Sequence, residues 1–249
     1  FNSLPTEPKI IALYLTHLSS FSKFSTLKRR IASIKVVHRL KGHYIDTKHP
    51  IITENIMGIK RKLGVKQTSK KPILINDLKK IINVINEEKN ELKKYQNKAL
   101  ILIGFAGGFR RSELVSIEYE DVDFVAEGVK ITVTKSKTDQ TGIGLTKAIP
   151  YFENKTYCPV ISLKKWIEYS NIKNGKVFKV SDKTVALTIK KYASIAGLDN
   201  SKYAGHSLRS GFATSTAEIG ADERSIMAMT GHKTTQMVRR YIQEANLFK

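Results

Sequence analysis

Apolar residues in the first quarter of the chain recur at helical spacing, with polar and basic residues between them. The pattern predicts three helices, one over 8–19, one that begins after Ser25 as its N-cap and ends at Gly42, and one over 51–63. The apolar stripes are Ile11, Leu15 and Leu18 in the first helix, Leu27, Ile31, Ile34 and Val37, facing inward, in the second, and Ile52, Ile56, Ile59 and Leu63 in the third. We therefore expect a small all-helical unit over 1–64.

Residues 65–72 are polar and basic and have no apolar periodicity, which is typical of a linker between domains. The remainder, 73–249, alternates between helical patterns and a few short segments of strand character. Helices are predicted near 76–88, 92–106, 162–172, 183–196, 207–219, 222–229 and 234–243, and strands near 122–124, 129–133 and 147–149. The expected fold is mainly α, with a helical amino-terminal domain and a mostly helical second domain that holds a small antiparallel sheet.

The net charge of the chain says more about its partner than the composition does. The 249 residues are 41% apolar, as in an ordinary globular protein, but 43 Lys and Arg against 22 Asp and Glu give a net charge of +21. Residues 1–72 hold 15 of the basic residues and only 3 of the acidic ones. Such an excess favours a polyanion as partner, through release of the counterions on a phosphate backbone. A solvated basic surface, a ribosome-associated protein and a binder of anionic lipid remain alternatives on charge alone.

Other features bound the class of protein. No stretch reaches the roughly 18 apolar residues that a membrane span needs, and the first residues lack the pattern of a secretory signal, so we expect a cytoplasmic protein without a membrane partner. The lone cysteine, Cys158, predicts neither a disulfide nor a metal site and is interpreted as an apolar filler. A first residue of Phe in place of Met predicts that the helical domain is truncated at its amino terminus.

Four short segments carry the candidate chemistry, although each alone is a weak signal. They are Gly-Phe-Arg-Arg-Ser-Glu-Leu at 108–114, Ser-Lys-Thr-Asp at 136–139, His-Ser-Leu-Arg at 206–209, and Gly-His-Lys-Thr at 231–234, which Arg-Arg-Tyr follows at 239–241. Only two of the six histidines fall in the second domain, and both lie inside these segments. In this order and spacing the segments resemble the tyrosine recombinase (phage integrase) family.

The resemblance covers the chain from about residue 73 onward, and the helices before it are similar to that family's core-binding domain, with Tyr14, Leu18, Thr26 and His38 in its usual context. It implies the DNA breaking-rejoining enzyme fold and a site-specific recombinase that exchanges strands through a 3′-phosphotyrosyl intermediate. The implied catalytic residues are Arg110, Lys137, His206, Arg209, His232 and the nucleophile Tyr241, with Glu113 in a supporting role. The implied partner is double-stranded DNA with inverted-repeat sites, bound by a homotetramer in the nucleoid.

These residue types suit attack on a phosphodiester. Two arginines, Arg110 and Arg209, can hold the negative charge of the transition state by paired hydrogen bonds, and no acidic cluster with magnesium-ligand spacing lies beside the motifs. We therefore expect neither a metal nor a nucleotide cofactor.

Proton transfer falls to the remaining motif residues. Tyr241 needs a base, for which His206 is favoured over His232, although the two roles can be exchanged. Lys137 is the expected general acid for the leaving 5′-oxygen, with Lys135 as its competitor two residues earlier.

Basic side chains outside the site are candidate DNA contacts, and they are Lys28, Arg29, Arg30, Lys60, Arg61, Lys62, Arg239 and Arg240. For the last two, a helix C-terminal pair that the macrodipole favours is an equal alternative. Two other functions stay open at this point. A type IB topoisomerase-like enzyme would relax DNA with the same chemistry, and a non-catalytic DNA-binding regulator would leave the motif residues unexplained.

Overall fold

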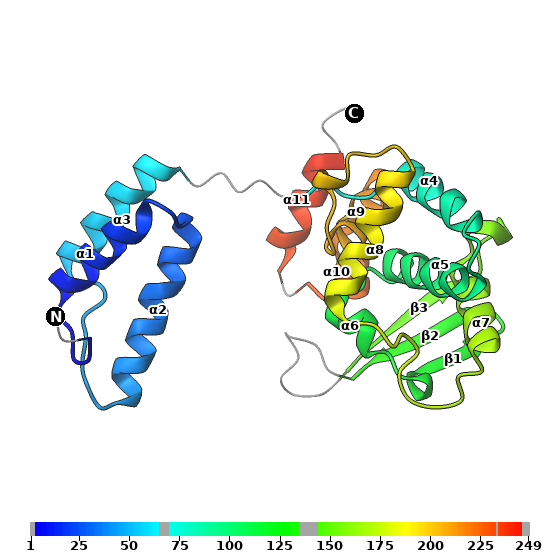
Figure 1. Cartoon of the computed structure of the whole chain (residues 1–249), viewed down its shortest axis with the longest axis horizontal. Helices are drawn as coiled ribbons and strands as arrows, with labels where there is room; N and C mark the ends of the chain where they lie inside the picture. Colours follow the sequence, from blue (N-terminus) through cyan, green and yellow to red (C-terminus); the bar gives the residue numbers. More distant parts are fainter. Residues whose placement is uncertain (1–2, 65–69, 135–143, 233, 246–249) are drawn as a thin grey trace. The chain divides into compact units, whose positions relative to one another are not determined.

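The structure is a computed structural model that describes residues 3–64, 70–134, 144–232 and 234–245. The chain divides into two compact units, Phe1–Ser69 and Lys70–Lys249. Figure 1 colours both along the sequence and labels their elements. No helix among the described residues is long and apolar enough to cross a membrane.

The first unit consists of three helices, α1 (Pro8–Ser19), α2 (Phe24–Leu40) and α3 (Pro50–Leu63) (Figure 1). Its core follows the predicted apolar spacing, with Ile11, Leu15, Leu27 and Ile52 almost fully buried. The prediction is wrong for Leu63, which is 40% exposed in the last turn of α3. The prediction of Ser25 as N-cap is wrong. The N-cap is Lys23, whose extended backbone precedes the helix without a side-chain cap, so Ser25 lies inside the first turn.

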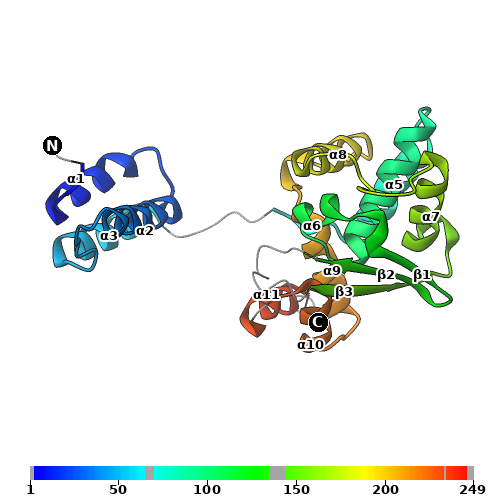
Figure 2. The same ribbon diagram turned by 90° about the horizontal axis from the view of Figure 1, so that it is seen from below.

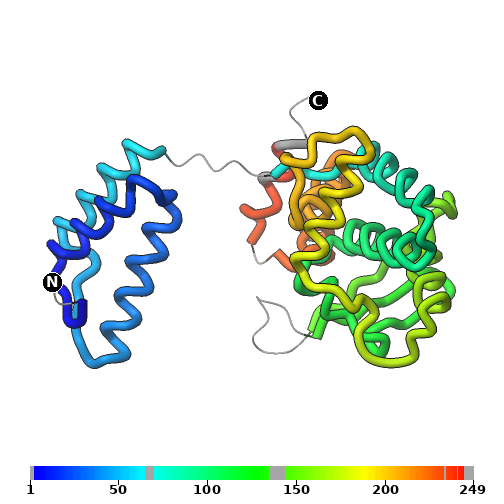
Figure 3. The backbone as a smooth tube through the Cα atoms, in the orientation of Figure 1, coloured from blue at the N-terminus to red at the C-terminus, as the bar shows by residue number. Residues whose placement is uncertain are grey.

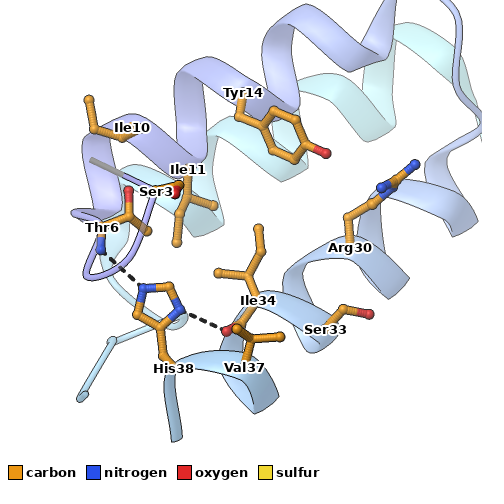
Figure 4. Close-up of a pocket in the computed structure, with 10 residues that line it drawn as sticks. All are labelled: Ser3, Thr6, Ile10, Ile11, Tyr14, Arg30, Ser33, Ile34, Val37 and His38. Carbon is orange, nitrogen blue, oxygen red and sulfur yellow. Dashed lines mark hydrogen bonds between the residues drawn. The ribbon is translucent and has the colours of Figure 1, made fainter. Parts of the chain in front are cut away.

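The inward face of α2 also differs from the prediction at one position. Val37 is 48% exposed, whereas His38 is 2% exposed. At 3.6 residues per turn, residue 38 comes back to about 20° from Leu27, while residue 37 lies about 80° away. In Figure 4 the His38 ring bridges two backbone groups, because its nitrogens contact the amide of Thr6 at 3.0 Å and the carbonyl of Ile34 at 2.9 Å. These hydrogen bonds explain why a histidine occupies a core position.

The second unit is mostly helical around a three-stranded sheet, as expected, and Figure 2 shows the sheet from a second direction. Its elements are α4 (Ile75–Asn86), α5 (Glu91–Ala106), α6 (Arg111–Ser116), β1 (Val122–Val125), β2 (Gly128–Val133), β3 (Leu145–Pro150), α7 (Pro159–Ser170), α8 (Asp182–Ile195), α9 (Ser207–Glu218), α10 (Glu223–Thr230) and α11 (Thr235–Ala245). Short 3₁₀ turns lie at Tyr119–Asp121, Lys155–Tyr157 and Asn200–Lys202.

Helix α5 is the centre of this unit. Its carboxy-terminal half is buried on every side, from Ala99 to Ala106, as expected of a helix that other elements surround. It packs against α7 and α9, and the tube in Figure 3 shows it inside the ring of the other helices. The end of α5 leads directly into Gly107 and Gly108, so a deeply buried helix end positions the turn that carries Arg110.

The sheet has the order β1-β2-β3 with antiparallel pairs throughout. In β3 the side chains of Lys147 and Ile149 point to the buried face, because alternate residues of a strand share a face. Lys147 lies opposite Ile131 of β2 in the register. Lys147 thus occupies a buried position of the strand, where an apolar residue is usual.

Candidate active site

Most of the motif residues lie at the ends of elements, whereas Tyr241 lies within a helix. Arg110 precedes α6, while His206 precedes α9 and Arg209 is in its first turn. His232 follows α10 after Gly231, whose φ of 63° ends that helix in the left-handed region that favours glycine, and Tyr241 is on α11. The predicted Lys137 and its competitor Lys135 lie outside the residues that the structure describes.

Glu113 and the end of α10 fix Arg110 in place. The Glu113 carboxylate accepts a hydrogen bond from the Arg110 backbone amide at 2.9 Å and also pairs with the Arg110 guanidinium. That carboxylate is 3% exposed, so its charge is compensated at short range. The other arm of Arg110 donates to the carbonyl of Gly231 at 3.2 Å. The guanidinium therefore links α6 to the segment that carries His232.

Arg209 is the more deeply buried of the two arginines, at 4% exposure. Its Nη1 donates to the carbonyl of Gly108 at 2.9 Å, whereas its buried Nη2 has no hydrogen-bond partner within the described parts of the chain. Burial, followed by the nearby charge of Arg110, lowers the pKa of Arg209 to about 10. Arg209 is still cationic at neutral pH, and an uncompensated buried donor of this kind is suited to an anionic acceptor.

Gly108 allows the two arginines to share one turn. Its φ of 55° lies in the left-handed region, and an added Cβ would meet Phe212 at 2.9 Å. The residue therefore exposes its carbonyl to Arg209 in a conformation that a larger residue would strain.

A hydrogen-bond chain sets the tautomer of His232. Thr230 donates its only hydroxyl proton to the carbonyl of Ile226 at 2.6 Å, so its oxygen must accept from His232 Nδ1, which lies 2.7 Å away. Burial and the charges of Arg209 and Arg110 lower the pKa of His232 to about 4. At neutral pH the ring is then uncharged, with its proton on Nδ1 and a free lone pair on Nε2.

Tyr241 lies beside this imidazole. The two ring centroids are 5.9 Å apart, and Tyr241 packs against the small cluster that Ala213, Ala217, Ile226 and Val238 form between α9, α10 and α11. Figures 1 and 2 both show α11 beside α9 and α10. The nucleophile candidate is thus on a helix that a few apolar contacts hold against the site.

His206 belongs to the same electrostatic environment. Its pKa is lowered by desolvation and by the charges of Arg111, Arg209 and Arg110. Arg111, which was not expected to be a site residue, lies 3.8 Å from Asp182 and fills the space beside Gly205, where a Cβ would meet it at 1.7 Å. A second neutral histidine therefore faces the arginines.

Tyr203, the other tyrosine near the His-x-x-Arg motif, is 2% exposed and donates to Asp77 at 2.8 Å. Burial raises the pKa of this phenol, as does the hydrogen bond to Asp77, so it is a structural residue that is poorly suited to ionise.

The basic side chains that were candidates for DNA contact have different surroundings. Six of them lie on the first unit, are exposed, and form no ion pair with any residue that the structure describes: Lys28, Arg29, Arg30, Lys60, Arg61 and Lys62. Arg239 instead pairs with Glu223 at 3.1 Å, and the side chain of Arg240 lies outside the described part of the chain.

Sequence reasoning missed Lys147, which the structure places against this site. Its ammonium contacts the carbonyls of Gly107 and Met229 and lies near both arginines. A signal was present, because Leu145, Lys147 and Ile149 alternate and a lysine stands between two apolar residues on one face. Among the described residues, no three His, Cys, Asp or Glu side chains group as a metal site would require.

Comparisons with known proteins identify the family of this chain. The phage integrase family matches residues 73–247. An integrase/recombinase XerD homolog of Selenomonas ruminantium is 41% identical over 99% of this chain and 76% of its own length, and tyrosine recombinase XerD of Staphylococcus saprophyticus is 30% identical over 92% and 70%.

Solved structures share the fold. The XerH site-specific recombinase in a post-cleavage complex with a palindromic difH substrate has a TM-score of 0.73 at 18% identity, covering 97% of this chain and 70% of that one. A lambda integrase dimer on a core site has a TM-score of 0.63 at 19% identity, covering 98% and 82%.

Proposed function

Because this chain belongs to the phage integrase family of tyrosine recombinases, we propose that it cuts and rejoins double-stranded DNA at specific sites through a covalent bond between Tyr241 and a 3′-phosphate. The observation that carries the proposal is the meeting of Arg110, Arg209, His232 and Tyr241, which come from four separate parts of the chain. A group of cationic side chains beside a phenol and neutral imidazoles is what metal-free phosphoryl transfer requires.

In the proposed reaction the Tyr241 oxygen attacks the scissile phosphorus, and the bond from phosphorus to the 5′-oxygen breaks. Arg110 and Arg209 hold the charge that develops on the nonbridging oxygens. The phenolic proton passes to a histidine, and the 5′-oxygen leaves as a hydroxyl with a proton from Lys137. In the reverse step a 5′-hydroxyl attacks the phosphotyrosine and tyrosine leaves. One ester replaces another, so the reaction needs no nucleotide.

Both histidines are suited to act as the base. The lowered pKa of each keeps its ring neutral at pH 7. In His232 the free lone pair is on Nε2, on the ring that lies beside Tyr241. His232 can therefore accept the phenolic proton, which supports an exchange of the roles that the sequence favoured, with His206 then donating to a phosphate oxygen.

The same proposal includes the assembly of the protein on DNA. The exposed basic side chains of the first unit would contact the DNA backbone, and a homotetramer on paired inverted-repeat sites would exchange strands in the nucleoid. The XerH fold neighbour is bound to a palindromic substrate, which supports symmetric sites as the substrate of this chain.

Covalent capture tests the function and identifies the target site in one experiment. We expect the wild-type protein, mixed with a pool of random duplexes that carry nicks, to retain a subset of them after denaturation, and sequencing of that subset gives the site. Paired copies of the recovered site should then recombine. Relaxation of supercoiled DNA without recombination would favour the topoisomerase-like alternative, and binding without any adduct would favour the DNA-binding regulator.

On the acid side, the rate of adduct formation should hold down to about pH 6.5, the ordinary pKa of histidine, and fall below that pH. The base must be neutral to act, and the pKa values of His206 and His232 are both lowered, so activity is lost as the pH falls through those values. The second-order rate constant measured with limiting protein reports the free enzyme. An acid limb centred above pH 6.5 would contradict the proposal that either histidine is the base.

Neutralising Lys28, Arg29 and Arg30 should weaken DNA binding and reduce its dependence on salt. Each phosphate contact that is removed should lower the log–log slope by about 0.9, so three substitutions to Gln should lower it by up to about 2.7. A matched control removes three exposed lysines on and beside α7, Lys164, Lys165 and Lys173, on the opposite side of the second unit from α11 (Figures 1 and 2). Equal slopes for the two triple variants would mean that these three side chains of α2 do not contact DNA.

A further inference from the structure

Strand β3 buries a lysine beside the site. Lys147 is 1% exposed and is among the largest fully buried side chains of the chain. A buried ammonium is costly unless hydrogen bonds compensate it. Its Nζ donates to the carbonyl of Gly107 at 2.6 Å and to the carbonyl of Met229, and it lies 4.5 Å from the centre of the Phe109 ring. These three contacts account for its three N–H donors.

The two carbonyls belong to the two segments that carry the candidate catalytic groups. Gly107 is three residues before Arg110, and Met229 is three residues before His232. The segments come close to each other here, because a Cβ built on Gly108 would lie 3.2 Å from Thr230. Lys147 therefore links the turn after α5 to the end of α10 from a third element, the sheet.

We propose that Lys147 is a positioning residue, whose ammonium ties the turn before Arg110 to the end of α10 before His232 and so fixes the separation of arginine and histidine for attack on phosphate. The proposal rests on the function proposed above. It does not make Lys147 the general acid, because the two carbonyls and the ring already occupy its donors.

The charges around Lys147 give the tie a pH dependence. Burial lowers the pKa of Lys147 to about 7, and the charges of Arg209 and Arg110 act in the same direction, whereas Glu113 opposes them. These groups and His232 face the amine from α6, α9 and the end of α10. Loss of the proton near neutral pH removes one donor and therefore weakens the tie.

The central experiment compares Lys147→Met with Lys130→Met. Lys130 is an exposed residue of the neighbouring strand, paired with Ala148, so the control makes the same substitution on the same sheet. On the duplex recovered by wild-type capture, Lys147→Met should bind with unchanged affinity but cleave on the order of a hundredfold more slowly, the effect of a displacement of about 1 Å. Lys147→Arg, which keeps donors and charge, should recover part of the rate. A folded Lys147→Met variant that cleaves like wild type overturns the proposal.

Two further readouts separate positioning from other roles. In a His232→Ala background, Lys147→Met should lower the cleavage rate by a smaller factor than it does in the wild type, because the lysine acts through that histidine. A purely structural effect would lower the rate by the same factor in both backgrounds. A substrate with sulfur as the bridging 5′-atom should leave Lys147→Met slow. Full additivity would overturn positioning, and rescue by sulfur would make Lys147 the acid instead.

A measurement without DNA or cleavage keeps the proposal testable if Lys147→Met does not fold. In the folded wild type, the imidazole ¹⁵N signals of His232 should shift with a midpoint near pH 7, where Lys147 loses its proton, and separately from the histidine's own titration near pH 4. The signals of His206 are followed in the same spectra as a reference. Lys147→Arg should abolish the shift, because arginine does not titrate there. His232 signals that follow only the histidine's own titration, over the whole pH range in which the protein stays folded, would overturn the proposal, while missing adducts in the capture experiment would overturn only the function.

Discussion

Replacing Tyr241 by phenylalanine should leave a protein that binds its DNA site with unchanged affinity and forms no covalent adduct with it. The substitution removes one oxygen, which is the atom that would attack phosphorus, and keeps the ring that packs against Val238 and Ile226. The measurement is denaturing electrophoresis of protein with a nicked form of the captured duplex, together with a binding titration. We expect the adduct band to disappear completely.

Tyr203→Phe is the matched control. It removes the same oxygen from the other tyrosine near the motif, where the hydroxyl donates to Asp77 in a buried position. Loss of that hydrogen bond should lower the free energy of unfolding by about 1 kcal/mol and leave adduct formation intact. An adduct that persists in Tyr241→Phe and disappears in Tyr203→Phe would exchange the roles of the two residues.

The fold could be predicted to a large extent from periodicity. Helix α1 has the predicted bounds, and the core positions Ile11, Leu15 and Leu18 are confirmed. Residues that are three and four apart lie on the same face of a helix, so their spacing identifies the buried face. The mainly helical fold with a small antiparallel sheet is confirmed as well. Helix α6 was not predicted, since six residues are too few to show a period.

The candidate site could be predicted only in part, because residue order identifies side chains but not their contacts. Arg110 and His232 were found from their motifs, yet the carbonyl of Gly231 that joins them is a backbone group without a sequence signature. The role of Thr230 in setting the tautomer of His232 likewise depends on a proton donated within its own helix. Lys147 carried a readable signal in the alternation of its strand, which was missed because the residue lies outside the four motif segments.

The site is built so that backbone carbonyls, more than carboxylates, hold its cations. Arg209 donates to Gly108, Arg110 to Gly231, and Lys147 to Gly107 and Met229, while Glu113 is the carboxylate that pairs with Arg110. A carbonyl orients a cation without neutralising it. The local charge therefore stays positive, which lowers the pKa values of both histidines and leaves the arginines able to bind phosphate.

Replacing Lys137 by alanine should slow cleavage of ordinary DNA by a factor on the order of 10² to 10⁴, the usual contribution of a general acid. The 5′-oxygen is a poor leaving group unless it receives a proton. A substrate with sulfur at that position departs as a thiolate, which is stable near neutral pH and needs no acid. Sulfur should therefore restore cleavage by Lys137→Ala but not by Arg110→Ala, whose defect is in charge stabilisation.

The same pair of substrates distinguishes the three lysines that are considered as the acid. Lys135 is two residues from Lys137 in the sequence, and Lys147 has its donors committed to carbonyls and a ring. Single-turnover rates for Lys135→Ala, Lys137→Ala and Lys147→Met on the oxygen and sulfur substrates give one ratio for each variant. We expect a large sulfur-to-oxygen ratio for Lys137→Ala alone. A large ratio for Lys135→Ala in its place would move the acid by two residues, and a wild-type ratio for all three would mean that the proton comes from a group other than these lysines.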